Sequence, residues 1–235
     1  MDPASVVVVV PVKPLAVAKS RLRDTFGSEE RMSLCRELLR RVLKAAQGVD
    51  LSEVWGMGGD PDVHRIAQAN GAIWMPEEVA GLNETMEIAF RKARDAGKAP
   101  LYLPADLPFV QPEDLRRLVQ SAGNLTDIVL APDRLGTGTN AILLAGAAPF
   151  RPALGAGSFQ RHLAQVASLG MRPSICYSQG LSWDLDTPAD MAIYEARSPG
   201  LTAELTGQPA NGLLKKPFGP FSAGLPHPSG EGWPR

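Results

Sequence analysis

Two aspartates separated by one residue, Asp184 and Asp186, are the strongest chemical signal in the chain. Side chains of an extended segment alternate between its two faces, so both carboxylates point to one side and Leu185 points to the other. Paired carboxylates repel each other unless a cation lies between them, which indicates a metal site. Asp186 has an alternative role as the cap of a helix that begins at Pro188.

A third aspartate, Asp106, follows a short hydrophobic run, with one proline two residues before it and another two residues after it. The prolines restrict the turn, so the carboxylate is held at the end of a predicted strand. Mg²⁺ binds one or two carboxylates together with phosphate oxygens, which makes Asp106 a candidate ligand. The alternative is an ordinary turn aspartate or a helix cap.

A basic segment follows the first predicted strand. It begins at Pro11, and Lys13, Lys19 and Arg21 supply its positive charge. Ligands of parallel α/β sheets bind beyond the carboxyl ends of the strands, so these cations could neutralise a triphosphate. Taken alone, the segment also fits an ordinary basic loop.

Two glycine-rich segments are candidate anion sites. The first runs from Gly136 to Asn140 and includes Thr139, and the second contains Gly155 and Ser158 at the start of a predicted helix. Backbone N–H groups of such loops and of helix N-termini attract anions. Glycine-threonine turns and serine caps are also common without a ligand, so neither segment identifies a site by itself.

The histidines and cysteines add little at this level. His162 lies on the helix that follows Ser158, where it could approach an anion or simply pack against its neighbours. Cys35 and Cys176 have no cysteine or histidine partner at metal-binding spacing, and both are predicted to be buried thiols.

The elements that must position these residues alternate between strand and helix. Strands are expected at 6–12, 54–57, 72–75, 101–103, 127–131, 140–144 and 173–177, and helices at 28–46, 61–70, 83–96, 112–121, 159–168 and 188–197. The β-branched run at 6–12 is typical of a strand buried on both faces of a parallel sheet. The pattern predicts an α/β, Rossmann-like three-layer sandwich with a mostly parallel sheet.

Length and charge narrow the class of protein. The chain has 235 residues, 44% of them hydrophobic, and a net charge of -1. One domain is expected over residues 1–198, and no basic field is available to bind nucleic acid. The N-terminus has no basic leader and its valine run is too short to cross a bilayer, so a cytoplasmic protein without a membrane partner is expected.

Residues 199–235 are rich in proline and glycine and lack apolar periodicity, which predicts a disordered tail. The chain also has no GxxxxGK[ST] motif and no GxGxxG after the first strand. These absences argue against a P-loop kinase and a dinucleotide oxidoreductase.

Six motifs, taken in order, resemble those of one family. They are Pro-Val-Lys with Ala-Lys-Ser-Arg-Leu, Gly-Leu-Asn at 81–83, Leu-Pro-Ala-Asp-Leu-Pro, Gly-Thr-Gly-Thr-Asn, Gly-Ala-Gly-Ser-Phe and Asp-Leu-Asp-Thr-Pro-Ala-Asp. Over residues 6–195 the chain resembles the 2-phospho-L-lactate or phosphoenolpyruvate guanylyltransferases. The resemblance implies a nucleotidyltransferase fold and transfer of GMP from GTP to the phosphate of a three-carbon acid. It also implies release of diphosphate, a role in coenzyme F-420 biosynthesis and the use of Mg²⁺, as two ions.

The resemblance also implies roles for individual residues. Asp106, Asp184 and Asp186 match metal-binding aspartates, which with Lys19 form the catalytic set. Thr139, Gly155 and Ser158 match positions that hold the phosphate of the acid. Pro11, Lys13, Lys19 and Asn83 match the nucleotide-binding motifs.

Two alternative functions stay open at this point. One is a molybdopterin or sugar-phosphate nucleotidyltransferase, for which a Gly-Gly first loop is expected in place of Pro11-Val12-Lys13-Pro14. The other is a non-catalytic nucleotide-binding module, which the three aspartates disfavour. Phosphoenolpyruvate, 2-phospholactate and a phosphoglycerate also remain as acids, and the first loop favours phosphoenolpyruvate because it is closer to bacterial members.

Overall fold

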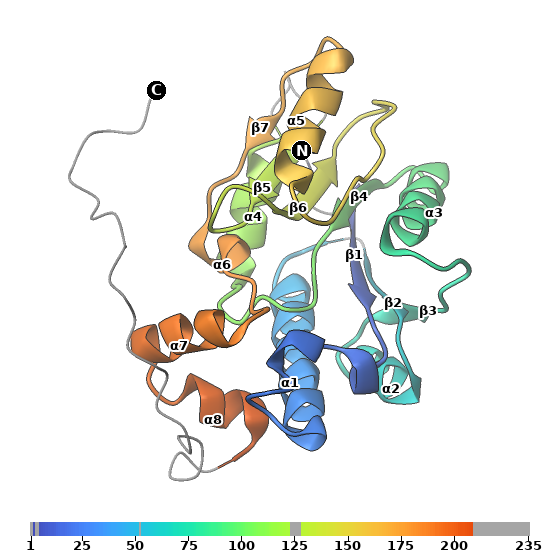
Figure 1. Ribbon diagram of the computed structural model, residues 1–235. Helices are drawn as coiled ribbons and strands as arrows, with labels where there is room; N and C mark the ends of the chain where they lie inside the picture. The colour runs from blue at the N-terminus through green and yellow to red at the C-terminus, as the bar shows by residue number, and fades with distance from the viewer. Residues whose placement is uncertain (1, 3–4, 52, 123–127, 209–235) are drawn as a thin grey trace, which may run out of the picture.

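The computed structural model describes residues 2, 5–51, 53–122 and 128–208. A seven-stranded sheet forms its centre, in the order β3-β2-β1-β4-β6-β5-β7 (Figure 1). The strands are β1 (Val6–Val12), β2 (Glu53–Gly58), β3 (Ile73–Met75), β4 (Ala99–Tyr102), β5 (Ile128–Pro132), β6 (Thr139–Leu144) and β7 (Ser174–Ile175). Of the strands that the described residues form, only β6 runs antiparallel to its neighbours, which confirms the mostly parallel α/β sheet.

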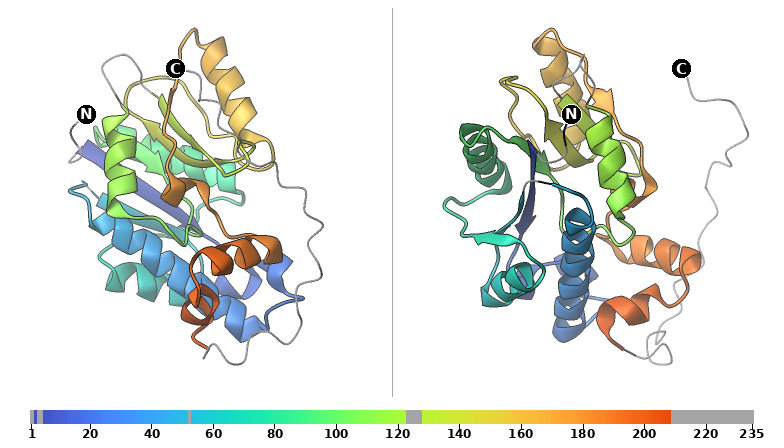
Figure 2. Two further views of the ribbon diagram at one scale, coloured as in Figure 1. Left: turned by 90° about the vertical axis from the view of Figure 1, so that its left-hand side faces the viewer. Right: turned by 180° about the vertical axis from the view of Figure 1, so that it is seen from behind.

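Helices cover both faces of the sheet (Figure 2). They are α1 (Ser28–Gln47), α2 (Pro61–Ala69), α3 (Leu82–Asp95), α4 (Pro112–Gln120), α5 (Ser158–Ser168), α6 (Gln179–Ser182), α7 (Pro188–Arg197) and α8 (Leu201–Thr206), with 3-10 turns η2 (Leu15–Val17) and η3 (Ser20–Leu22). Among the residues described, no helix is long and apolar enough to cross a membrane.

Strand β1 is buried on both faces, as its valine run predicts. Val6, Val8 and Val10 pack in the core under α1, α2 and α4, whereas Val7 and Val9 pack in the core under α3 and α5. Side chains two residues apart face the same way on a strand, so one unbroken apolar run fills both layers.

Strand β6 begins at the edge of the sheet where the parallel strands end. Because β6 is antiparallel to β4, its first residue, Thr139, lies near the carboxyl end of β4. The register pairs Tyr102 with Ile142, and its continuation by two residues places Asn140 level with Pro104. The glycine-rich segment before β6 therefore meets the loop that carries Asp106.

Two expectations from the sequence need correction here. Residues 183–186 form an irregular segment and not a strand. Residues 199 onward do not lose regular structure at once, because α8 packs against α1 with Leu201 and Leu205 buried. The remainder of the expected tail, residues 209–235, lies outside the described residues, as does Asp127, the expected first residue of β5.

Candidate active site

A cavity of about 630 Å³ opens beyond the carboxyl ends of β1 and β4. From β1 the chain continues to β2, on one flank of the β1–β4 pair, and from β4 it continues to β5, on the opposite flank; such a switch in strand order creates a crevice for ligands in α/β sheets. Among the predicted site residues, those that line the cavity are Pro11, Lys13, Lys19, Asp106, Gly155 and Asp186.

The loop after β1 is held in place by a contact that sequence reasoning missed. Asp60 caps α2, and its second carboxylate oxygen accepts a hydrogen bond of 2.7 Å from the backbone N–H of Leu15. Farther along this loop, Lys19 adopts a left-handed conformation with φ of 50°. A non-glycine residue in that region is strained, so the surrounding contacts must hold it there.

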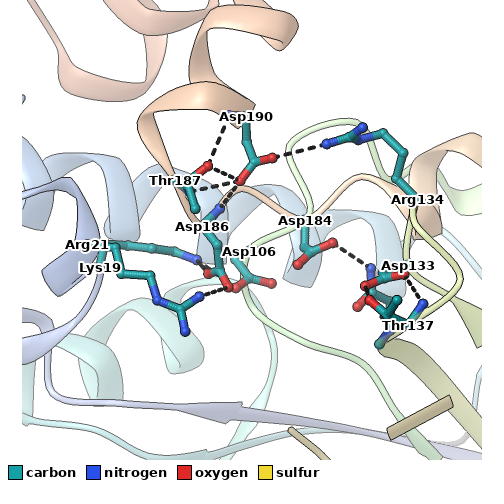
Figure 3. A network of polar contacts seen from close by, with 12 residues as sticks. Lys19, Arg21, Asp106, Asp133, Arg134, Thr137, Asp184, Asp186, Thr187 and Asp190 are labelled. Atoms are coloured by element: carbon teal, nitrogen blue, oxygen red, sulfur yellow. Dashed lines mark hydrogen bonds and ion pairs between the residues drawn. The ribbon is translucent and has the colours of Figure 1, made fainter. Parts of the chain in front are cut away.

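Those contacts are two carboxylates. The Lys19 ammonium lies 2.6 Å from an oxygen of Asp106 and 2.8 Å from an oxygen of Asp186 (Figure 3). Burial lowers the pKa of Lys19, but the two aspartates outweigh this effect and leave the pKa above its usual value. Burial by itself would raise the pKa of Asp186. The positive charges of Lys19 and Arg21 outweigh this effect of burial and leave the pKa of Asp186 below its usual range.

A backbone contact explains why aspartates from distant segments meet. The N–H of Leu185 donates to the carbonyl oxygen of Asp106 at 3.0 Å, which fixes the Asp184–Asp186 segment against the loop after β4. Leu185 is fully buried, so the two aspartates still turn toward the site although they do not lie on a strand. Thr187 is the N-cap of α7, and Asp186 is therefore free of the capping role that was its alternative.

Asp184 has a different environment from Asp186. Its carboxylate accepts one hydrogen bond of 3.0 Å from the side-chain amide of Asn140. Burial, followed by the negative charge of Asp106, raises the pKa of Asp184 to about 6. The ionised form therefore lacks a sufficient positive partner in the protein itself.

The donor set fits a divalent cation. One oxygen of Asp106, Oδ1, is buried and has no hydrogen-bond partner among the described residues, an arrangement that is costly unless a ligand completes it. Within the same described ranges, no three His, Cys, Asp or Glu side chains form a ready-made metal cage. Mg²⁺ does not need one, because it takes one or two carboxylates with water and substrate phosphates.

A second polar group lies beside the acidic cluster and consists of neutral side chains. Thr139 and Ser158 are buried, and their hydroxyl oxygens lie 3.3 Å apart. The Oγ1 atom of Thr139 also lies 2.9 Å from Nδ1 of His162, which is completely buried. Burial lowers the pKa of His162 to about 4, so the ring is neutral at physiological pH.

Residues 153–157 form a loop, here called the strap, that carries Gly155 along the wall of the cavity. Asn83 on α3 accepts a hydrogen bond of 2.7 Å from the N–H of Leu154, and the Arg161 guanidinium donates to the carbonyl oxygen of Ala153 at 2.8 Å. Gly155 and Gly157 have φ of 109° and 70°, values that favour glycine. The structure thus uses Asn83 to fix the strap, and Asn83, like Asp184, Thr139 and Ser158, is not among the residues that line the cavity.

Some lining residues carried no signal in the sequence. Tyr102 is buried at the end of β4, where burial and the charges of Asp106, Asp184 and Asp186 raise the pKa of its hydroxyl. Glu77 follows β3, and its carboxylate accepts a hydrogen bond of 3.2 Å from the buried hydroxyl of Thr85. Both residues line the cavity, and only their positions just after or at the end of a strand could have indicated them.

A family model described as "Guanylyl transferase CofC like" matches residues 6–195. The chain belongs to this family. The matched range includes β1 and continues into α7, so it contains every predicted site residue. Membership makes the protein a nucleotidyltransferase and displaces the molybdopterin and sugar-phosphate alternatives.

Named relatives share most of this length. A phosphoenolpyruvate guanylyltransferase of Rubrobacter xylanophilus is 41% identical over 195 residues, which cover 82% of this chain and 94% of that protein. One of Sphaerobacter thermophilus is 37% identical, with 86% and 98% covered. A 2-phospho-L-lactate guanylyltransferase of Methanocaldococcus jannaschii is 29% identical, with 78% and 80% covered.

Solved structures confirm the nucleotidyltransferase fold. A Desulfovibrio desulfuricans protein assigned as a nucleotide-diphospho-sugar transferase superposes with a TM-score of 0.69 at 17% identity, covering 86% of this chain and 94% of that one. A nucleotidyl transferase of Methanothermobacter gives a TM-score of 0.58 at 15% identity, with 82% and 97% covered. A glucosyl-3-phosphoglycerate synthase of Mycobacterium tuberculosis, in complex with Mg²⁺ and UDP, gives 0.53 at 15% identity, with 87% and 80% covered.

Proposed function

We propose that this protein transfers GMP from GTP to the phosphate of phosphoenolpyruvate, releases diphosphate and thereby makes a precursor of coenzyme F-420. The observation that carries the proposal is the meeting of Asp106, Asp184 and Asp186 beside the cavity, with one buried oxygen of Asp106 lacking a partner. Guanylyltransferase relatives at 41% and 37% identity name phosphoenolpyruvate as the acid, whereas the relative named for 2-phospho-L-lactate is 29% identical.

The reaction joins two anions, because a phosphate oxygen of the acid attacks the α-phosphorus of GTP and diphosphate leaves. The main requirement is therefore neutralisation of charge and in-line positioning, and no strong base is needed. Mg²⁺ bound by the three aspartates would supply the positive charge that both phosphates need. The neighbour solved with Mg²⁺ and UDP shares this fold and supports the choice of a divalent cation, and we propose that two ions are used.

The basic loop after β1 is proposed to receive the triphosphate. Lys19 is already held at the acidic cluster, and Lys13 and Arg21 lie on the same loop. Pro11 is half-buried, follows the buried part of β1 directly and lines the cavity beside them. On this assignment Lys19 neutralises the phosphates and positions the α-phosphorus near the aspartates, which is its catalytic role.

The acid is proposed to bind between the acidic cluster and the strap, with its phosphate near Thr139, Ser158 and Gly155. Gly155 lines the cavity, and Thr139 begins β6 beside the loop of Asp106. Asn83, which the family resemblance implies as a nucleotide ligand, is proposed to contribute here by fixing the strap.

The proposal is tested by incubating the protein with GTP, Mg²⁺ and one of three acids: phosphoenolpyruvate, 2-phospho-L-lactate or 3-phosphoglycerate. Product masses and diphosphate release are measured together. Formation of the guanylylated acid, fastest with phosphoenolpyruvate, is the expected result. Binding of GTP without diphosphate release with any acid would instead favour the non-catalytic module.

A further inference from the structure

The buried imidazole of His162 bonds through both of its ring nitrogens. Nε2 lies 2.9 Å from the backbone nitrogen of Ala153 on the strap, and Nδ1 lies 2.9 Å from the hydroxyl oxygen of Thr139. The side chain is completely buried, so neither nitrogen exchanges these partners for water. His162 thus joins the strap to the first residue of β6.

The bond to Ala153 determines which ring nitrogen carries the proton. A backbone N–H can only donate, so Nε2 must offer its lone pair. A neutral imidazole has one N–H, and that proton must then sit on Nδ1. Nδ1–H in turn donates to Oγ1 of Thr139, which therefore accepts a hydrogen bond from the ring.

Counting protons in the network gives a consequence for the two hydroxyls. Thr139 and Ser158 have one hydroxyl proton each, and only one of these can lie between their two oxygens. Among the described residues, neither hydroxyl has another acceptor within hydrogen-bond distance. One hydroxyl proton is then left without an acceptor among the described residues. With the proton on Nε2 instead, Thr139 would donate to the ring, Ser158 would donate to Thr139, and none would be left.

We propose that His162 is a positioning residue that makes the Thr139–Ser158 pair a net hydrogen-bond donor, and so adapts it to an anionic oxygen of the acid substrate. The proposal rests on the proposed function, because it deepens the role of that acid site. A hydroxyl pair can accept or donate, and a fixed ring proton removes this ambiguity before the ligand arrives. The same ring holds the strap through Ala153, so strap position and hydroxyl direction are set together.

Two substitutions separate these two tasks of the ring. The amide of glutamine reaches about as far as Nε2, so His162→Gln can still accept from Ala153 but loses the donor to Thr139. The amide of asparagine reaches about as far as Nδ1, so His162→Asn keeps that donor and loses the acceptor for Ala153. We expect His162→Gln to raise the KM for the acid by up to about tenfold, because the hydroxyl pair is no longer held in the donating direction and its hydrogen bond to the anionic acid is weakened, with the KM for GTP unchanged.

The order of the two variants is the decisive result. His162→Asn leaves a buried N–H of Ala153 unsatisfied, so its melting temperature should fall further than that of His162→Gln. Its KM for the acid should nevertheless be the lower of the two. A KM that rises in step with the loss of melting temperature would show a merely structural role and overturn the proposal.

Coupling to Thr139 provides a second test. If His162 acts through the hydroxyl, His162→Gln should change the KM for the acid little in a Thr139→Val background, because the group it directs is already absent. Equal effects of His162→Gln in both backgrounds would contradict the proposal.

A third test uses the wild-type protein, so it does not depend on whether a variant folds. The ¹⁵N shifts of the His162 ring, recorded by NMR, should show a protonated Nδ1 and an unprotonated Nε2. The reverse pattern would overturn the inference even if GMP transfer to the acid is observed. Failure of GMP transfer with the expected ring pattern would instead count against the proposed function alone.

Discussion

The acidic cluster of Asp106, Asp184 and Asp186 and the neutral network of Thr139, Ser158 and His162 lie at the same edge of the sheet but are built on opposite principles. The cluster brings three carboxylates near one another, pairs two of them, Asp106 and Asp186, with one buried ammonium, and leaves an oxygen of Asp106 unpartnered. The network has no net charge, because His162 is neutral, and its groups bond mainly to each other. The cluster is thus suited to a divalent cation, whereas in the network every proton except one hydroxyl proton already has an acceptor.

This difference predicts how each region responds to loss of one group. Removing a carboxylate changes the charge of the site by one unit, which alters metal binding and catalysis together. Removing one hydroxyl removes a single hydrogen bond and should affect only the ligand that it contacts. Five substitutions, ordered from the largest expected effect to the smallest, test the contrast.

Asp106→Asn should have the largest effect. Loss of a metal ligand is expected to cost several kcal/mol of transition-state stabilisation, so turnover should fall at least about 100-fold. The fold should persist, because the substitution keeps the size of the side chain. Diphosphate release with GTP, Mg²⁺ and phosphoenolpyruvate is the assay, and Glu113→Gln, an exposed carboxylate on α4, is the control. Turnover of Asp106→Asn at the level of this control would remove the metal assignment.

Replacing Asp184 and replacing Asp186 should change the stability of the metal-free protein in opposite directions. The pKa of Asp184 in the folded protein is about 6, above the value of about 4 expected for the unfolded chain, so stability falls as pH rises between these values. Asp184→Asn removes that cost and should raise the free energy of unfolding at pH 8 by about 1–3 kcal/mol. Asp186 has a lowered pKa, so its charge stabilises the fold above pH 4, and Asp186→Asn should lower stability.

Denaturant unfolding at pH 8 and pH 4, with a chelator present, measures both changes. The advantage of Asp184→Asn should shrink toward pH 4, where the wild-type carboxyl is protonated in the folded protein. Both variants should lose turnover with Mg²⁺ present. A destabilised Asp184→Asn at pH 8 would mean that its charge is already balanced inside the protein.

Ser158→Ala tests the neutral network. Loss of one hydrogen bond to a charged group costs about 1.5–3 kcal/mol, so the KM for the acid should rise about tenfold or more. The KM for GTP should stay near its wild-type value, because the cavity residues of the β1 loop are untouched. Steady-state kinetics with each substrate varied in turn provide the measurement. A selective loss of GTP binding would show that the two pockets are exchanged.

Asn83→Ala should have the smallest effect and decides to which region Asn83 belongs. Its side chain accepts a hydrogen bond from the N–H of Leu154, and a neutral hydrogen bond contributes about 0.5–1.5 kcal/mol. If Asn83 acts through the strap, the KM for the acid should rise about three- to tenfold. The family resemblance suggests a nucleotide contact instead, and in that event the KM for GTP would rise and the KM for the acid would not.

The sequence alone determined the α/β class, the order of its elements and the residue types of the site. Val6–Val12 predicts a strand buried on both faces because its β-branched run leaves no polar side to expose, and the structure has that strand. Asp106, Asp184 and Asp186 could be selected because their neighbours, Leu103 and Leu185 among them, are apolar residues that anchor them to the core.

Local sequence patterns did not predict features that depend on contacts between distant segments. Helix α8 has six residues, too few for a periodic signal in the sequence. It forms because it packs against α1, with Leu201 and Leu205 buried. The bond between Leu185 and Asp106 holds the aspartates together without the strand that alternation suggested.

The direction of the Thr139 and Ser158 hydroxyls at the proposed acid site is the clearest case of a property that only the tertiary structure decided. In the sequence, His162 can be a surface, packing or ligand residue, because nothing nearby fixes its environment. Folding places its two nitrogens between Ala153, nine residues before it, and Thr139 on another strand. The backbone N–H of Ala153 can only donate, and this geometric fact, absent from any local pattern, sets the position of the ring proton.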